Sequence, residues 1–242
     1  MPNPLVIGHA CAAGEAPANT LAGVRAALDA GAEAMEIDVQ LCADGIPVLM
    51  HDETVDRTTN LTGPVRALSL EALLGANAGD GEPVPTLDQV LQLVDGQLTV
   101  MCELKATPNE PAYDQRLVDA VLEVIGSHGA KTWTAIHSFN PDMVDRARST
   151  ERRVSAAIIS LPVVAEEVDR LLGALLKRNG QAISVEHHAI NRELIVKAKR
   201  RQVTVWAWTA DTEADWARII EAGVDGIITN VPHRLRAYLA RG

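Results

Sequence analysis

The sequence predicts an α/β fold, a TIM (β/α)8 barrel that carries a small hairpin excursion after its second strand. First, strand-like and helix-period segments alternate along all 242 residues, a length that suits one barrel domain of roughly 250 residues. Second, the pair Asp44-Gly45 separates two strand-like runs, and so short a turn joins antiparallel strands. Third, nine strand-like runs without that hairpin leg leave eight, the number that closes the barrel. We therefore expect a single domain spanning residues 1–242.

The N-terminal segments introduce both the barrel and its excursion. A short apolar run over residues 5–9 predicts the first strand, and helical spacing over 20–30 predicts its helix. The next strand is expected over 34–41 and the returning hairpin leg over 46–52. This leg runs antiparallel to its neighbour, so it is not one of the barrel strands.

The remaining segments alternate in the same way. Further strands are expected over 98–105, 133–138, 154–160, 183–187, 203–209 and 226–230. Helices are expected over 69–74, 87–94, 117–125, 141–149, 163–177, 193–200, 212–222 and 233–240.

Composition narrows the classes of partner. The chain has 22 Lys and Arg against 32 Asp and Glu, a formal net charge of −10, and no basic block, which argues against nucleic acid as the main ligand. We find no apolar run of 18 residues and no signal-peptide pattern, so we expect no membrane span and a cytoplasmic location. Three cysteines without CxxC spacing argue against a disulfide framework. The sequence does not indicate the oligomeric state.

Ionisable residues interrupt strands that should be apolar. Glu36 and Asp38 are two residues apart, so their side chains share one face of the second strand. Glu103 and Lys105 end the next barrel strand, and His9 ends the first. Because catalytic groups of TIM barrels gather at the C-terminal ends of the strands, these five predict a functional site there.

The three carboxylates predict a cation site. Glu36, Asp38 and Glu103 cannot all stay ionised in a small volume without a neutralising cation. Oxygen ligands favour a hard divalent ion, Mg²⁺ or Ca²⁺, and the absence of zinc-type His or Cys spacing makes zinc a weaker candidate. The alternative is that they are strand-end carboxylates exposed to solvent or paired with Lys105.

Two histidines are candidates for proton transfer. The hairpin carries His51 back toward the end of the second strand, where it would face His9 across the cation site. Asp52 would orient His51 or, equally, cap the following turn. The alternative for each histidine is a structural role. His137 and His187 lie at strand ends and could line the pocket, but no role is assigned to them.

These residues resemble the glycerophosphodiester phosphodiesterases, a family of phospholipase-C-like TIM barrels. The resemblance covers nearly the whole chain in order. It rests on His9, Pro17-Ala18-Asn19-Thr20, Glu36-x-Asp38, Asp44-Gly45, His51-Asp52, Arg57-Thr58-Thr59, Glu103-Leu104-Lys105, Ser138-Phe139, Trp208-Thr209 and the closing GVDGIITN.

The resemblance implies metal-dependent hydrolysis of a small-molecule glycerophosphodiester to glycerol 3-phosphate and an alcohol. It assigns Glu36, Asp38 and Glu103 to the metal, and His9 and His51 to general acid and base catalysis in an order left open. Lys105 would contact the phosphate. Trp208, with Phe139, would form a wall for the glycerol, although Trp208 could instead only fill the barrel core.

Three positions depart from the family pattern. Ala10 stands where an arginine usually follows the first histidine, Ala18 replaces a glutamate, and Asn230 replaces a common aspartate. Loss of a bidentate arginine–phosphate contact should weaken binding or rate. One interpretation is an enzyme whose phosphate is held by Lys105, the metal and Arg57. The alternatives are a member with lost or altered activity that binds a phosphorylated metabolite, and a binding scaffold on a generic barrel.

Overall fold

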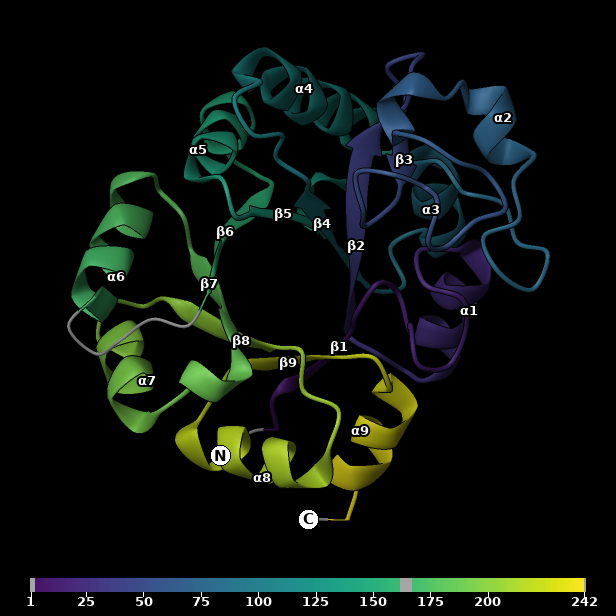
Figure 1. The fold of residues 1–242 in the computed structure, drawn as a ribbon. Coiled ribbons are helices and arrows are strands. Elements are labelled where there is room, and N and C mark those ends of the chain that lie inside the picture. Colours follow the sequence, from purple (N-terminus) through teal and green to yellow (C-terminus); the bar gives the residue numbers. More distant parts are fainter. Residues whose placement is uncertain (1–2, 162–166, 242) are drawn as a thin grey trace.

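The computed structural model describes residues 3–161 and 167–241, and these form a closed parallel barrel ringed by helices (Figure 1). The described strands are β1 (Leu5–Gly8), β2 (Ala34–Leu41), β3 (Pro47–Leu49), β4 (Thr99–Leu104), β5 (Thr134–Ser138), β6 (Ser155–Ser160), β7 (Ala182–Glu186), β8 (Thr204–Trp208) and β9 (Gly226–Thr229). The sheet order is β1-β9-β8-β7-β6-β5-β4-β2-β3, and pairing of β1 with β2 closes the ring. The predicted TIM barrel is therefore confirmed.

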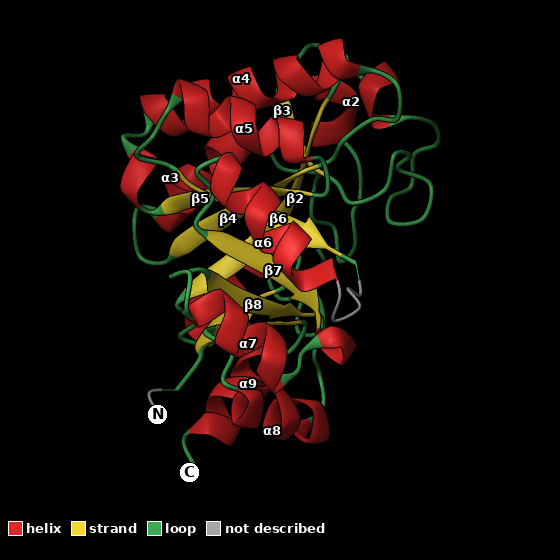
Figure 2. Ribbon diagram, turned by 90° about the vertical axis from the view of Figure 1, so that its left-hand side faces the viewer, coloured by secondary structure: helices red, strands yellow, loops and turns green. Residues whose placement is uncertain are grey.

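Helices cover the outside of this ring, as the side view shows (Figure 2). The described α-helices are α1 (Leu21–Asp29), α2 (Leu70–Leu74), α3 (Leu87–Val94), α4 (Pro111–Ser127), α5 (Pro141–Thr150), α6 (Val168–Lys177), α7 (Arg192–Lys199), α8 (Glu213–Ala222) and α9 (Pro232–Leu239). The first four residues of the helix expected over 163–177 lie outside the described residues. Helix α4 begins earlier than the expected 117–125 because Pro111 occupies its first turn, where its missing N–H costs no hydrogen bond.

The hairpin excursion has the predicted topology but a shorter second leg. β3 pairs antiparallel with β2, and Gly45 adopts a positive φ of 75° in the connecting turn. The predicted leg, 46–52, placed His51 on the strand. This was wrong, because β3 ends at Leu49 and His51 lies in the loop that follows. A separate apolar cluster packs under the excursion: Cys42, Val48, Met50, Val55, Val65, Leu73, Ala76, Ala78 and Val84.

Side-chain caps and burial explain why the elements form where they do. All eight residues of β2 are buried, as expected for a strand covered on both faces. Thr20 and Thr86 cap α1 and α3, and Thr86 forms a capping box with Gln89. The strand expected over 183–187 ends at Glu186, because His187 begins a 3₁₀ turn, His187–Ala189.

The described residues bear on two expectations drawn from composition. Within residues 3–161 and 167–241, no helix is long and apolar enough to cross a membrane. Cys11, Cys42 and Cys102 are all buried and free, as the absence of paired spacing predicted.

Candidate active site

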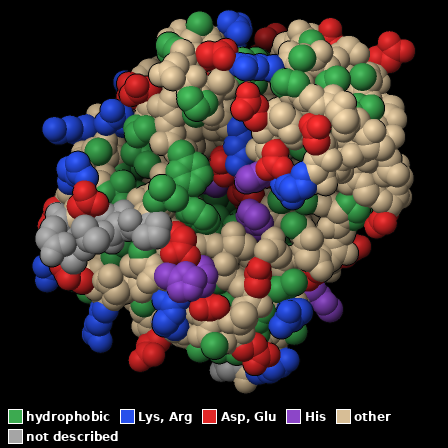
Figure 3. All heavy atoms as spheres, viewed as in Figure 1, with side chains coloured by type: hydrophobic (Ala, Val, Ile, Leu, Met, Phe, Trp, Pro, Cys, Tyr) green, Lys and Arg blue, Asp and Glu red, His purple; other side chains and the backbone are tan. Residues whose placement is uncertain are grey.

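A cavity of about 260 Å³ opens at the C-terminal ends of the barrel strands and contains most of the residues singled out in the sequence. Charged and histidine side chains gather at the hollow over the barrel centre, with hydrophobic side chains beside them (Figure 3). We call this the barrel-mouth cavity. Its lining includes His9, Glu36, His51, Glu103, Lys105, His137, Phe139, Ile159, Ser184, Trp208, Thr209 and Ile228.

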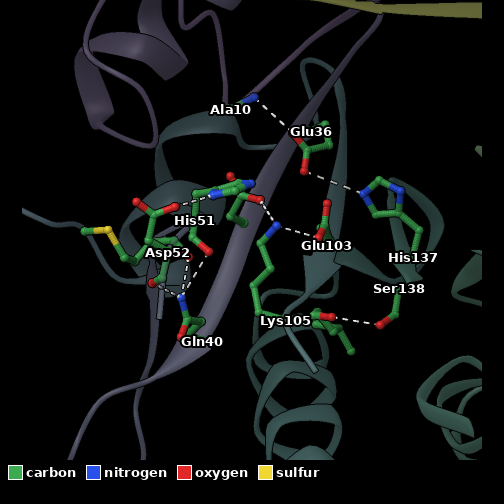
Figure 4. Close-up of polar contacts among 12 residues, drawn as sticks. Ala10, Glu36, Gln40, His51, Asp52, Glu103, Lys105, His137 and Ser138 are labelled. Atoms are coloured by element: carbon green, nitrogen blue, oxygen red, sulfur yellow. Dashed lines mark hydrogen bonds and ion pairs between the residues drawn. The ribbon is translucent and has the colours of Figure 1, made fainter. Parts of the chain in front are cut away.

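Glu36 is the most buried acid of the cavity, with 2% of its surface exposed. Its Oε2 accepts a hydrogen bond of 2.9 Å from the Ala10 N–H (Figure 4). The same oxygen lies 4.0 Å from Nε2 of His9. Burial acts to raise the pKa of Glu36, but contacts with His137 and His9 lower it to about 2. Glu36 is therefore an anion in the folded protein.

Glycine at position 8 lets the loop after β1 approach Glu36. A Cβ on Gly8 would collide with the Cys11 carbonyl oxygen, so a side chain there would displace the loop. The Cys11 N–H donates to the Glu36 carbonyl at 2.8 Å. The backbone of β2 and its Glu36 carboxylate thus both hold the segment that carries His9.

Asp38 and Glu103 share the ammonium group of Lys105, and Figure 4 shows its contact with Glu103. Nζ of Lys105 lies 2.7 Å from Asp38 Oδ1 and 2.5 Å from Glu103 Oε1, and these ion pairs raise the pKa of Lys105 against the effect of burial. Asn19 donates to the other Asp38 oxygen at 2.7 Å. The alternative interpretation from the sequence, ion pairing with Lys105, therefore describes these two acids in the structure.

His137 joins the site although the sequence assigned it no role. In the parallel register, Glu103 pairs with both Asp38 of β2 and His137 of β5, so all three residues lie at one level of the barrel. Ligand atoms of Glu36, Glu103 and His137 lie within 4.8 Å of one another. The signal that could have found His137 is its position near the C-terminal end of a barrel strand, which matches that of Glu103.

These groups fit a cation. Glu36 Oε1 is buried and has no hydrogen-bond partner among the described residues; His137 Nε2, 3.7 Å away, also lacks one there. Three carboxylates face a single ammonium group, so the cluster carries surplus negative charge. Burial and repulsion by Glu36 and Asp38 raise the pKa of Glu103 even though Lys105 acts to lower it. An orphaned oxygen in a surplus of negative charge is the environment that a divalent ion would satisfy.

His9 presents one ring nitrogen to the cavity. Its Nδ1 lies 2.7 Å from Oδ1 of Asn230, whose amide nitrogen donates to Asp211 at 2.6 Å. Because Asn230 can only accept at that oxygen, Nδ1 of His9 carries the proton and Nε2 is free. Burial acts to lower the pKa of His9, but Glu36 and the Asn230 hydrogen bond raise it overall.

His51 is held in a similar way from the opposite loop. Its Nδ1 lies 2.7 Å from Oδ1 of Asp52, and Arg57 donates to the second Asp52 oxygen at 2.5 Å. Gln40 of β2 donates to the carbonyls of Met50 and Asp52 at 2.8 and 2.6 Å, which ties this loop to the barrel (Figure 4). Asp52 therefore contacts His51 directly, as one of the two sequence interpretations required.

Replacing Asp52 by asparagine is expected to have a moderate effect. The Arg57 hydrogen bond, opposed by burial and reinforced by His51, lowers the pKa of Asp52 from 3.8 to about 2. Its contribution to the free energy of unfolding is therefore complete above about pH 4 and is lost as the pH falls through 2. Asp52→Asn should remove this part of the acid dependence and, by releasing His51, lower kcat about 10- to 100-fold. Urea unfolding between pH 2 and 5, together with steady-state kinetics, would measure both; unchanged kcat would contradict the orienting role.

Two aromatic side chains form one wall of the barrel-mouth cavity. The rings of Phe139 and Trp208 meet edge to face, with centroids 5.8 Å apart. Trp208 is partly exposed, and Phe139 is 44% exposed. Both therefore offer apolar surface to the cavity, and Trp208 is more than a filler of the barrel core.

A second cavity, of about 300 Å³, meets the first at His9 and His51. We call it the alanine pocket, because Ala10, Ala13, Ala18 and Ala78 line it together with Leu49, Met50, Asn19, Asp38, Arg57 and Thr58. Ala10 and Ala18, two positions that depart from the pattern noted in the sequence, thus line one pocket, with Arg57 in the same lining.

Comparison with known proteins agrees with this geometry. The family model described as "Glycerophosphoryl diester phosphodiesterase family" matches residues 9–234. A glycerophosphodiester phosphodiesterase of Caldanaerobacter subterraneus subsp. tengcongensis is 32% identical over 247 residues, which cover 98% of each chain. Among solved structures, a Silicibacter pomeroyi protein has a TM-score of 0.92 at 27% identity, covering 100% of this chain and 95% of that one. An Oleispira antarctica phosphodiesterase, solved with its product sn-glycerol-3-phosphate, shares the fold with a TM-score of 0.88 at 24% identity and 98% and 97% coverage.

The barrel, the site at its mouth and the named relatives define an enzyme of the phosphoric diester hydrolase class. Within that class, the chain belongs to the glycerophosphodiester phosphodiesterase family, because the family model spans nearly its whole length. The resemblance predicted from the sequence is therefore confirmed.

Proposed function

We propose that this enzyme hydrolyses a small glycerophosphodiester to glycerol 3-phosphate and an alcohol, and that the reaction depends on a divalent metal. The observation that carries the proposal is a buried surplus of negative charge lying between two histidines whose Nδ1 atoms are both held. Such a surplus would repel a phosphodiester unless a cation neutralised it. We also propose that residues 1–242 form one catalytic domain.

Glu36, Asp38 and Glu103 are the proposed metal ligands, and the imidazole of His137 is near enough to be a fourth donor. Carboxylate oxygens favour Mg²⁺ or Ca²⁺, and an imidazole among the donors would also accept a transition metal. When bound, the metal would polarise the phosphate oxygens and neutralise charge in the transition state. Asp38 could become a ligand only if Lys105 moved from its present ion pair, which would free that ammonium for the substrate phosphate.

The two histidines are proposed as the proton-transfer pair. Each is fixed through Nδ1, so each has Nε2 available, one to take a proton from the attacking hydroxyl and the other to protonate the leaving alcohol. Phe139 and Trp208 would pack against the glycerol carbons. The alternative of a metabolite-binding protein without activity is not favoured, since the proposed acid, base and cation groups are all present together.

A coupled assay for glycerol 3-phosphate tests the proposal. Purified enzyme should release it from a glycerophosphodiester, lose at least about 100-fold of its rate after chelation, and recover with one divalent ion. Separate restoration with Mg²⁺, Ca²⁺, Mn²⁺ and Zn²⁺ would identify the metal. A rate that chelation leaves unchanged would contradict metal dependence, and release of the alcohol without glycerol 3-phosphate would contradict the stated product.

A further inference from the structure

The proposed reaction places no part of the substrate in the alanine pocket, although this pocket shares both proposed proton-transfer residues with the barrel-mouth cavity and is also lined by Asp38. His9 and His51 are the residues that line both cavities. A phosphodiester has two alkyl arms on one phosphorus atom. If the phosphorus lies between these histidines, the two arms can extend into different cavities.

The walls of the two cavities differ in chemistry. The barrel-mouth cavity has an aromatic wall, whereas no aromatic ring other than the two imidazoles lines the alanine pocket among the described residues. Ala10, Ala13, Ala18 and Ala78 line the pocket together with Leu49 and Met50. At about 300 Å³, it is large enough for a small alcohol moiety.

The described residues of the alanine pocket offer a cationic group no free partner. Asp38 has Lys105 and Asn19 on its two oxygens, so it offers no free carboxylate. The Arg57 side chain is 65% exposed, and its Nε forms an ion pair of 2.5 Å with Oδ2 of Asp52. A trimethylammonium group would therefore find neither an unpaired carboxylate nor a Trp, Tyr or Phe face in this pocket, and the arginine beside it is paired with Asp52.

We propose that the alanine pocket binds the alcohol arm of the diester and selects an uncharged alcohol, such as a second glycerol, over choline or another ammonium alcohol. This inference rests on the proposed function. Ala18, an exposed residue of the loop before α1, then helps to set specificity because its side chain carries no charge.

A charge-reversal experiment at position 18 tests the assignment. Wild type should hydrolyse glycerophosphoglycerol with a kcat/KM about tenfold above that for glycerophosphocholine. Ala18→Asp should raise kcat/KM for the choline diester, relative to the glycerol diester, about tenfold over Ala18→Asn. Asparagine is the matched control because it has the same shape without the charge, and Ala67→Leu, an exposed change in the excursion outside the pocket, should leave the ratio unaltered.

The outcomes separate this inference from the proposed function. Equal effects of Ala18→Asp and Ala18→Asn on the ratio, or a wild-type preference for the choline diester, would overturn the assignment of the pocket. Calorimetric titration of the same two diesters into wild type and both variants, with chelator present, gives the preference independently of turnover. If no diester is hydrolysed but the binding preference shifts as expected, the proposed reaction fails and the pocket assignment stands. Thermal unfolding of each variant confirms that the compared proteins are folded.

Discussion

Replacing Glu36 with glutamine is expected to lower kcat/KM by about a thousandfold while the barrel stays folded. The substitution keeps the size of the side chain and an oxygen that accepts from the Ala10 N–H. It removes the negative charge of the buried carboxylate, whose Oε1 has no hydrogen-bond partner among the described residues. Loss of about 4 kcal/mol of transition-state stabilisation, within the range that a bound metal supplies, corresponds to that factor. Because contacts with His137, His9 and the Ala10 N–H stabilise the Glu36 anion, the metal-free variant should unfold at a somewhat lower temperature but still as a folded barrel.

Glu33→Gln is the matched control. Glu33 precedes the same strand at the opposite end of the barrel, where it pairs with Arg236 near the surface. Its loss should change kcat/KM less than about twofold, because Glu33 lines neither cavity, and it should change stability little, because exposed ion pairs contribute little to it. Metal titration by calorimetry should show weaker binding in Glu36→Gln alone. Full activity of Glu36→Gln with wild-type metal affinity would show that this carboxylate is not part of the site.

Substitution of either proton-transfer histidine is also expected to lower kcat strongly. His9→Asn and His51→Asn should each lower kcat about 10²- to 10⁴-fold, the range usual for removal of a positioned general acid or base. Neither should change the barrel strands, since both side chains lie in loops beyond the strand ends. His128→Asn provides a control, because His128 pairs with Asp88 on the outer helices and does not line either cavity.

The leaving group decides which histidine is the acid. An activated diester with a p-nitrophenol leaving group needs little protonation, so it should restore most of the rate to the variant that lacks the acid and little to the variant that lacks the base. The unactivated diester measured beside it shows the full defect of both variants. Equal rescue of both, or a loss below about threefold in either, would contradict the assignment of a proton-transfer pair.

Local pattern was sufficient for the barrel and its excursion. Burial of consecutive apolar residues and helical periodicity are properties of neighbouring residues, so the eight barrel strands and the antiparallel leg could be identified from spacing. Asp44-Gly45 determined the hairpin because the positive φ of Gly45 suits a short turn. The carboxylates at the barrel mouth were also identifiable, since charged side chains within strands are unusual.

The partners of those side chains depended on tertiary structure. Register between β2, β4 and β5, which no local pattern encodes, placed His137 beside Glu103. The tertiary structure paired Asp38 with Lys105 and Asn19. It also left one oxygen of Glu36 without a hydrogen-bond partner among the described residues. The sequence by itself therefore determined the fold class and most candidate residues, because these follow from short-range periodicity. Only the folded chain decided which charges neutralise one another and that Ala10, Ala13 and Ala18 share a pocket with Ala78, because both depend on contacts between residues far apart in sequence.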